Sequence, residues 1–270
     1  MNFNSVCEAL KNAGIEDYKF EARILLEEFC GSASEFSEYD SSQLEAAIER
    51  RCQHYPLQYI LGKWDFYGYE FKVNESCLIP RADTETVIEV AKRLLSKDKT
   101  VRIADLCAGS GCIGITLLRE RKNMLCDAVE LYPNTLDTAK ENSRLHGVEN
   151  RYNAILADVL AGDCLDGKYS AIISNPPYIR RDVIDSLSDE VKKEPVAALD
   201  GGEDGLVFYR SILDLYAQNL DLNGKFIFEI GYDQGDSLKA LAKEREMSCD
   251  IIRDLGGRDR VAVISPRTPA

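Results

Sequence analysis

Five short apolar runs recur along the middle of the chain, each followed by polar sequence that suits a helix. They cover residues 101–107, 125–131, 153–157, 169–174 and 225–230. Apolar runs of strand length that alternate with helical segments are typical of parallel strands buried on both faces. The alternation begins near residue 84 and predicts an α/β fold built on a parallel sheet.

The last two apolar runs are closer together than any of the others. Residues 250–255 and 260–265 are separated only by Gly256-Gly257-Arg258-Asp259. A connection this short permits only an antiparallel pair, because parallel strands need a long crossover. We therefore expect a parallel sheet closed by an antiparallel hairpin, which differs from the standard dinucleotide-binding strand order.

The part of the chain before the sheet shows a different pattern of apolar residues. Two stripes with helical spacing are predicted, one at Phe20, Ile24, Leu25 and Phe29 and the other at Leu44, Ile48 and Cys52. Residues 64–73 are aromatic and roughly alternating around Gly68, which predicts a β-hairpin. At about 150 residues per domain, the 270 residues suggest two domains. We predict a helical domain over 1–60, a hairpin linker over 61–82, and the sheet domain over 83–270.

The charge balance and the cysteines indicate which kinds of partner and site to expect. Lys and Arg number 33 against 46 Asp and Glu, a net charge of −13, which disfavours a duplex-binding protein and favours a neutral or basic partner. The nine cysteines lack Cys-x-x-Cys spacing and only His54 and His146 accompany them, so we expect neither a disulfide framework nor a metal site. No signal-peptide pattern and no apolar run of about 20 residues occurs, so we expect a cytoplasmic protein.

A glycine-rich loop follows the first apolar run. Gly109, Gly111 and Gly114 match the spacing G-x-G-x-x-G, in which the backbone turns sharply and a ligand approaches it closely. Glu130, at the end of the second run, can accept hydrogen bonds from both hydroxyls of a ribose. The spacing alone also fits a glycine-rich turn with an acid downstream by chance.

Two cofactors compete for such a loop. A dinucleotide places its pyrophosphate at the helix N-terminus, whereas S-adenosylmethionine carries no phosphate. Asp105 precedes the loop, and a carboxylate there favours the amino group and sulfonium of a methyl donor and disfavours a pyrophosphate. The loop therefore leans towards the methyl donor without deciding between the two.

The segment Asn175-Pro176-Pro177-Tyr178 directly follows the fourth apolar run. Two prolines remove two N–H donors and keep the chain extended, which leaves the Pro176 carbonyl free to face a ligand. Asn175 adds a side-chain acceptor and Tyr178 a flat ring. This set suits a planar group with an NH₂, because two acceptors fix both N–H bonds and aim the poorly nucleophilic lone pair. A strand-ending turn without a ligand is the structural alternative.

With these motifs together, the chain resembles the HemK/PrmC family of protein-(glutamine-N5) methyltransferases, which act on the Gly-Gly-Gln glutamine of class I peptide chain release factors. The resemblance covers nearly the whole chain. The segments that carry it are residues 56–62, 78–85, 105–111, 174–178, 199–206, 229–235 and 254–260. Two positions depart from the family pattern: Ala82 stands where a second proline is common, and Cys107 where glycine is common.

The resemblance implies a fold, a donor and roles for individual residues. It implies a seven-stranded, Rossmann-like class I methyltransferase sheet with an antiparallel last strand, after an N-terminal helical domain that recognises the substrate. The donor would be S-adenosylmethionine, leaving S-adenosylhomocysteine, held at Cys107, Ala108, Gly109, Ser110, Gly111, Glu130, Val159 and Asn175. The substrate amide would lie against Asn175, Pro176, Pro177 and Tyr178, with Asn175, Pro176 and Tyr178 catalytic. The partner would be a release factor rather than nucleic acid or membrane, and the enzyme a monomer without a metal.

Some alternatives stay open at this point. The Asn-Pro-Pro-Tyr segment is shared with enzymes that methylate amino groups of nucleic-acid bases, and the glycine loop with nicotinamide-dependent dehydrogenases. Val159 can be a core residue and Asp158 a helix cap. We interpret Trp64 and the tyrosine-rich hairpin as packing between domains, and we assign His54 and His146 no role.

Overall fold

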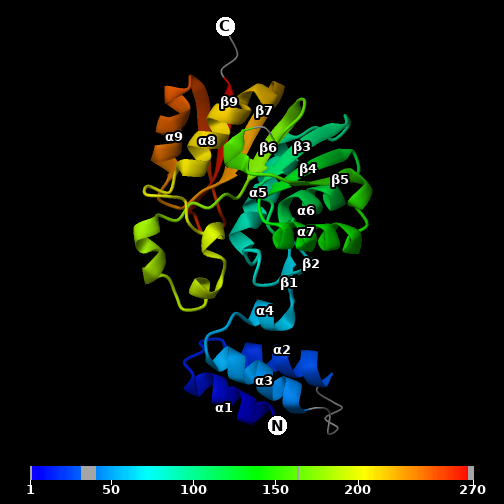
Figure 1. The fold of residues 1–270 in the computed structure, drawn as a ribbon, viewed down its shortest axis with the longest axis vertical. Helices are drawn as coiled ribbons and strands as arrows, with labels where there is room; N and C mark the ends of the chain where they lie inside the picture. Colours follow the sequence, from blue (N-terminus) through cyan, green and yellow to red (C-terminus); the bar gives the residue numbers. More distant parts are fainter. Residues whose placement is uncertain (1, 32–40, 163, 267–270) are drawn as a thin grey trace.

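The computed structural model describes residues 2–31, 41–162 and 164–266. The N-terminal part holds four helices: α1 (Phe3–Asn12), α2 (Tyr18–Cys30), α3 (Ser41–Cys52) and α4 (Leu57–Leu61). They pack through a small apolar cluster of their own, at the opposite end of the molecule from most of the sheet (Figure 1). The helical character predicted for this part of the chain is confirmed.

The buried face of α2 agrees with the predicted stripe except at Phe20. Phe20 is 60% exposed, whereas Ala22, Leu25 and Leu26 are buried. Ile24 and Phe29 of the predicted stripe are partly buried and pack against the helical cluster, so only the first residue of the stripe lies outside the face that meets α1 and α3. The second predicted stripe holds better, because Leu44 and Ile48 of α3 are buried.

A hairpin joins the helical part to the sheet. Strands β1 (Lys63–Phe66) and β2 (Tyr69–Lys72) pair antiparallel around Tyr67 and Gly68, both with positive φ as a tight two-residue turn requires. Phe66 and Phe71 join the sheet core, whereas Trp64 packs against the helical cluster. The hairpin therefore packs on both parts of the chain, as expected.

The main sheet has seven strands in the order β5-β4-β3-β6-β7-β9-β8. Their bounds are β3 (Val101–Leu106), β4 (Met124–Glu130), β5 (Tyr152–Leu156), β6 (Tyr169–Ser174), β7 (Leu220–Glu229), β8 (Met247–Arg253) and β9 (Asp259–Pro266). All pair in parallel except β9, which runs antiparallel to both β7 and β8. The predicted mixed sheet is confirmed.

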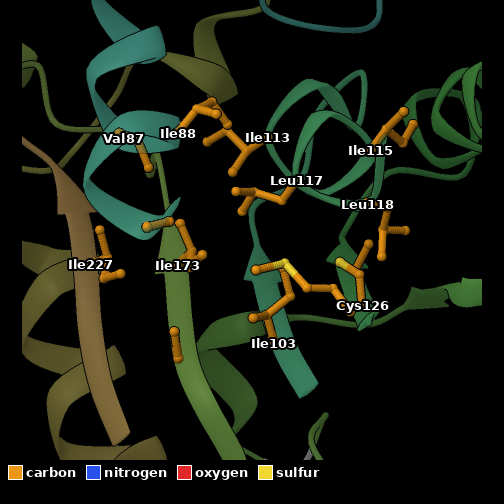
Figure 2. Packing of buried hydrophobic residues seen from close by; sticks show 14 of the residues in the cluster. Val87, Ile88, Ile103, Ile113, Ile115, Leu117, Leu118, Cys126, Ile173 and Ile227 are labelled. Carbon is orange, nitrogen blue, oxygen red and sulfur yellow. The ribbon is translucent and has the colours of Figure 1, made fainter. Parts of the chain in front are cut away.

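Helices cover both faces of this sheet. They are α5 (Glu85–Leu94), α6 (Cys112–Glu120), α7 (Pro133–Leu145), α8 (Val207–Tyr216) and α9 (Gly235–Glu244). Side chains of α5, α6 and α7 belong to one core cluster, and side chains of α8 and α9 belong to the other. Figure 2 shows the first cluster, where Val87 and Ile88 of α5 lie near Ile113 and Leu117 of α6 above the strands. Because both faces of the strands are buried, their sequences are nearly continuous apolar runs.

Short 3₁₀ turns occupy the connections. They are η1 (Ala82–Thr84), η2 (Glu149–Arg151), η3 (Val159–Ala161), η4 (Arg181–Ser186), η5 (Val191–Lys193), η6 (Val196–Ala198) and η7 (Ala217–Asn219). Three of them, η4 to η6, lie in the long connection between β6 and α8, which extends from the sheet towards the helical part (Figure 1).

Candidate active site

The carboxyl ends of β3 and β6 lie side by side where the strand order reverses. β3 pairs with β4 on one side and β6 on the other, and Leu106 is opposite Ser174. The chain runs outward from β3 to β5 and then returns to β6. Open α/β sheets bind ligands in the crevice at such a reversal. A cavity of about 390 Å³ opens there, lined by parts of both predicted segments.

The glycine loop folds as its spacing predicts. Gly111 has φ +81° at the start of α6, and a Cβ on it would lie 2.7 Å from Ile115 Cδ1. A Cβ on Gly114 would lie 2.8 Å from Cys126 Sγ, so this glycine allows α6 to pack closely on β4. Around Gly109, with φ +57°, a Cβ would meet nothing within 4 Å. The loop backbone at Gly109 is therefore open to the cavity, which it lines.

Cys107 lies at the cavity in an unusual backbone conformation. Its φ is +58°, the left-handed region that glycine adopts most easily. This explains physically why glycine is common at this position in similar loops. Cys107, Ala108 and Ser110 all line the cavity. Burial raises the pKa of the Cys107 thiol well above its usual range, so the thiol stays neutral.

Glu130 binds the glycine loop from the neighbouring strand. Its Oε2 accepts a hydrogen bond from Gly109 N at 3.0 Å, and its Oε1 accepts from Leu131 N and Tyr132 N. The carboxylate also lines the cavity. Oε1 already accepts two hydrogen bonds, so the acceptor capacity that remains for a ligand hydroxyl is on Oε2.

Asp105 lies buried beneath the glycine loop. Its carboxyl group is buried beneath the loop, and its Oδ2 accepts from Gly114 N at 2.9 Å. Burial raises its pKa to about 7, while that hydrogen bond and the charge on Glu130 have smaller effects. Asp105 is absent from the cavity lining, so its carboxyl group lies beneath the loop and not at the cavity surface. Its role is to hold the start of α6 against β3.

Asp158 and Val159 reach the cavity from the end of β5. Val159 is buried and lines the cavity, as a contact beside a flat ligand group requires. Asp158 also lines it, and its Oδ1 accepts from Leu160 N at 2.8 Å. Asp158 is therefore a cap of η3, which was the structural alternative for this residue.

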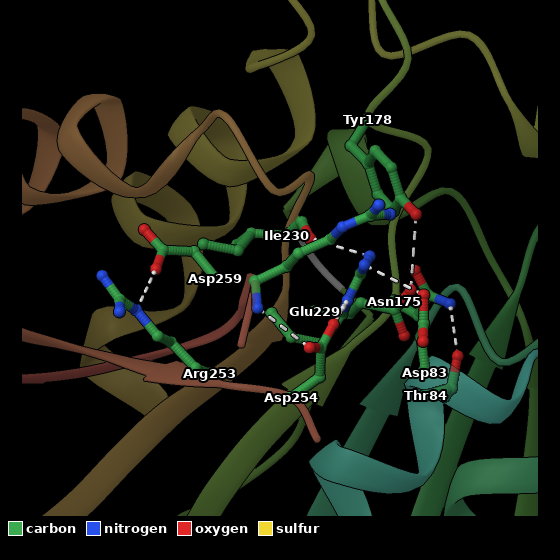
Figure 3. Close-up of polar contacts among 11 residues, drawn as sticks. Asp83, Thr84, Asn175, Tyr178, Glu229, Ile230, Arg253, Asp254 and Asp259 are labelled. Carbon is green, nitrogen blue, oxygen red and sulfur yellow. Dashed lines mark hydrogen bonds and ion pairs between the residues drawn. The ribbon is translucent and has the colours of Figure 1, made fainter. Parts of the chain in front are cut away.

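Residues 175–178, called the acceptor segment below, fall into two pairs. Asn175 and Pro177 line the cavity, whereas Pro176 and Tyr178 are absent from its lining. The Tyr178 hydroxyl points away towards Glu229, with Oη 3.4 Å from Oε1 (Figure 3). Ser174, just before the segment, donates to the Leu106 carbonyl at 2.6 Å and so ties the segment to the glycine loop.

Glycines further along the chain hold the backbone of Tyr178. A Cβ on Gly205 would lie 2.4 Å from Tyr178 O, and one on Gly201 would lie 2.7 Å from Tyr178 Cα. Gln234 Nε2 donates to that same carbonyl at 3.1 Å and to Gly205 O at 3.1 Å. Small residues at these two positions therefore permit the close contact that fixes the acceptor segment.

Two residues beside Asn175 were missed from the sequence. Asn175 Nδ2 donates to Thr84 Oγ1 at 3.3 Å, and Thr84 lines the cavity. Glu229, the last residue of β7, is 1% exposed, and burial raises its pKa to about 7. An acid near the end of the predicted run 225–230 was a signal that could have identified Glu229, because strand ends meet at this edge. Thr84 gave no local signal.

The linker before α5 closes another side of the cavity. Arg81 lines it and forms an ion pair with the buried Glu194, whose Oε2 also accepts from Ile79 N at 3.1 Å. Glu194 belongs to the connection between β6 and α8, and four residues earlier in that connection Glu190 Oε1 lies 2.6 Å from Arg51 Nη2 of α3. Two ion pairs thus join the connection between β6 and α8 to the linker and to the helical part. Other lining residues that sequence reasoning missed are Cys77, Ile113, Leu131, Tyr132 and Thr135.

Among the residues that the structure describes, no helix is long and apolar enough to cross a membrane. All nine cysteines lie in the described ranges, and none of them forms a disulfide.

Comparison with known proteins gives two family matches along the chain. Residues 3–62 match the PrmC N-terminal domain, and residues 84–212 match the methyltransferase small domain. The chain is 36% identical over 268 residues to the release factor glutamine methyltransferase of Clostridium botulinum, covering 93% of each chain. It is 34% identical to the protein of that name from Agrobacterium fabrum, covering 93% of this chain and 92% of the other. A solved methyltransferase from Pyrococcus furiosus shares the fold, with a TM-score of 0.54 at 15% identity over 74% of this chain and 89% of that one.

Proposed function

This chain belongs to the family of release factor glutamine methyltransferases, and from that membership we propose which of its residues carry the reaction. It is an S-adenosylmethionine-dependent enzyme that methylates glutamine in release factors. We propose more closely that the methylated atom is the side-chain nitrogen N5 of the Gly-Gly-Gln glutamine in class I release factors. One observation carries the assignment of the site: the glycine loop and the Asn-Pro-Pro-Tyr segment meet at one cavity and are joined by the Ser174–Leu106 hydrogen bond.

The residues around the cavity fit S-adenosylmethionine. The backbone at Gly109 is open, Glu130 offers its Oε2 to the ribose, and Val159 gives an apolar contact for a flat base. We propose that these residues, with Cys107, Ala108, Ser110, Gly111 and Asn175, hold the donor. When bound, S-adenosylmethionine supplies a methyl group attached to a positively charged sulfur.

The acceptor segment suits a primary amide. We propose that Asn175 Oδ1 and the Pro176 carbonyl accept the two N–H bonds of the glutamine amide, while Pro177 and Tyr178 shape the contact around it. The amide nitrogen is a poor nucleophile because its lone pair is delocalised into the carbonyl. Two fixed N–H bonds orient that lone pair and favour the pyramidal nitrogen formed during attack.

We propose that the helical domain over residues 1–60 recognises the release factor, that residues 61–82 form the linker, and that residues 83–270 form the catalytic domain. Separate apolar clusters in the helical part and in the sheet support this division. The net charge of −13 favours a basic protein over nucleic acid as partner. We propose that the enzyme acts as a cytoplasmic monomer.

The test is methyl transfer from labelled donor to purified release factor, with RNA and DNA as competing acceptors. We expect label in the protein, on the glutamine side chain by mass analysis of peptides. Asn175→Ala should lower kcat by about a hundredfold or more, in a protein that still folds. Asn223→Ala, at an exposed position of β7, is the matched control. Label in RNA or DNA, or near-normal turnover by Asn175→Ala, would contradict the proposal.

A further inference from the structure

A buried carboxyl group lies behind the acceptor segment and is not used in the proposed reaction. Glu229 Oε1 receives the 3.4 Å contact from the Tyr178 hydroxyl, and its Oε2 has no partner of normal hydrogen-bond geometry among the described residues. Buried polar atoms are nearly always paired, so an unpaired one calls for an explanation.

The charges around Glu229 do not neutralise it. Arg260 of β9 is the nearest cation, but its guanidinium is shared with Asp83 Oδ2 at 2.9 Å and Asp254 Oδ2 at 3.3 Å (Figure 3). The other titratable groups that face Glu229 are Tyr178 from the acceptor segment, Tyr209 from α8 and Cys112 from α6. Burial raises the pKa of all three, so they are neutral near pH 7.

Thr84 connects this carboxyl group to Asn175. Its hydroxyl accepts the hydrogen bond from Asn175 Nδ2, and its polar effect on Glu229 lowers the pKa of that carboxyl group, which favours the ionised carboxylate. A hydroxyl has a single hydrogen, so the hydrogen bonds run in one direction, from Asn175 through Thr84 to Glu229. The nitrogen end of the Asn175 amide is then held at Thr84, and its oxygen end is left for the cavity.

When Glu229 is protonated, the hydrogen bonds no longer have to run from Asn175 through Thr84 to Glu229. A protonated carboxyl group can donate to Thr84, whose own hydrogen is then free to reach Asn175 Oδ1. The two ends of an amide have nearly the same shape, so the reversed side chain fits equally well. A reversed Asn175 presents N–H groups to the N–H bonds of the acceptor amide, which is unfavourable.

We propose that Glu229 is a positioning residue, which in its ionised form and through Thr84 holds Asn175 with Oδ1 towards the acceptor. This inference rests on the proposed role of Asn175 in binding the glutamine amide. Because burial places the pKa of Glu229 at about 7, the ionised fraction changes most around that pH. The value of kcat should therefore rise with pH through that midpoint and level off above it.

The first experiment needs no turnover. The Glu229 carboxyl group is observed by ¹³C NMR in the full-length protein and is identified by its absence in Glu229→Gln. We expect it to titrate near pH 7, and we expect the ¹⁵N resonance of the Asn175 side-chain amide to shift with the same midpoint. Thr84→Val should raise the Glu229 pKa further and uncouple the Asn175 shift. If the Asn175 side-chain resonance does not shift with the Glu229 titration, the inference is wrong.

The second experiment compares pH profiles of kcat. Thr84→Val keeps the shape of the side chain and removes the hydroxyl, so we expect kcat to fall on the order of tenfold and to lose its rise near pH 7. Thr84→Ser should restore the rise, and Glu229→Gln should abolish it. Thr116→Val, at another buried threonine in α6, is the matched control for removing a core hydroxyl.

The outcomes separate the two proposals. If the wild type methylates the glutamine and Thr84→Val keeps both its kcat and its pH profile, the positioning role is wrong and the proposed function stands. If the wild type labels nucleic acid instead, the proposed function fails, and the NMR titration still decides whether Glu229 orients Asn175.

Discussion

Ser174 and Leu106 join the two halves of the active site, because the Ser174 hydroxyl donates to the Leu106 carbonyl at 2.6 Å. Both residues are fully buried at the ends of neighbouring parallel strands. Replacing Ser174 with Ala leaves the Leu106 carbonyl without this partner, which costs about 1–3 kcal/mol of the free energy of unfolding. We expect a lower midpoint in urea and a lower kcat. Ser170→Ala, on the same strand but hydrogen-bonded to Asp221, is the control, and equal kcat values for the two variants would contradict the coupling of the halves.

Glu130 acts on the donor site both directly and through the loop. Glu130→Ala removes its contacts with a ribose and also the hydrogen bond that it accepts from Gly109 N. We expect the affinity for S-adenosylmethionine, measured by calorimetry, to fall by about 2–4 kcal/mol. Glu130→Gln keeps one acceptor oxygen and should lose less. An unchanged affinity in the alanine variant would remove Glu130 from the site.

Asp105 makes the stability of the protein depend on pH. Its pKa is about 7 in the folded protein against 3.8 as the ordinary value, so the folded state keeps a proton that the unfolded chain releases between these pH values. The free energy of unfolding therefore falls as pH rises through this window. Asp105→Asn cannot ionise, so its stability relative to the wild type should improve by about 2 kcal/mol between about pH 5.5 and about pH 8. Urea unfolding at both pH values tests this, and a constant difference would contradict it.

The ion pair between the helical domain and the long connection should respond unequally to loss of its two partners. Arg51 is 3% exposed and binds both Glu21 and Glu190, whereas the Glu190 side chain is 42% exposed. The Glu21 side chain is only 12% exposed, and Arg51→Met leaves its carboxylate without a cation. We therefore expect a loss of about 3 kcal/mol in unfolding free energy. Glu190→Gln should cost less than about 1 kcal/mol. Similar losses in both variants would show that the contact with Glu190 dominates.

The sheet was predictable because buried parallel strands leave a simple trace in the sequence. β6 has the predicted bounds, and β3, β4 and β5 differ from prediction by one residue at their ends. β7 begins at Leu220, five residues before the predicted run, because its polar start pairs with β6 across an irregularity in register near Tyr169. Pairing of this kind depends on the neighbouring strand and cannot be recognised in the local sequence.

The site was predictable in part for the same reason. The glycine loop and the acceptor segment each follow a strand, so local sequence placed both at one edge of the sheet. Thr84 and Glu229 lie 91 and 54 positions from Asn175 and reach it only through the packing of η1 and β7. The side-chain direction of Asp105 could not be predicted, because a strand end allows either face and the hydrogen bond from Gly114 N decides between them.

The place of β9 in the sheet has a consequence for how the enzyme is made. β9 lies between β7 and β8 and carries Arg260, yet it follows every other strand along the chain. During translation the ribosome exposes the other six strands first, so β7 keeps an open edge until the last strand emerges. The charge network beneath Asn175 therefore forms late, and a growing chain that holds every predicted site residue still lacks the strand that completes the site.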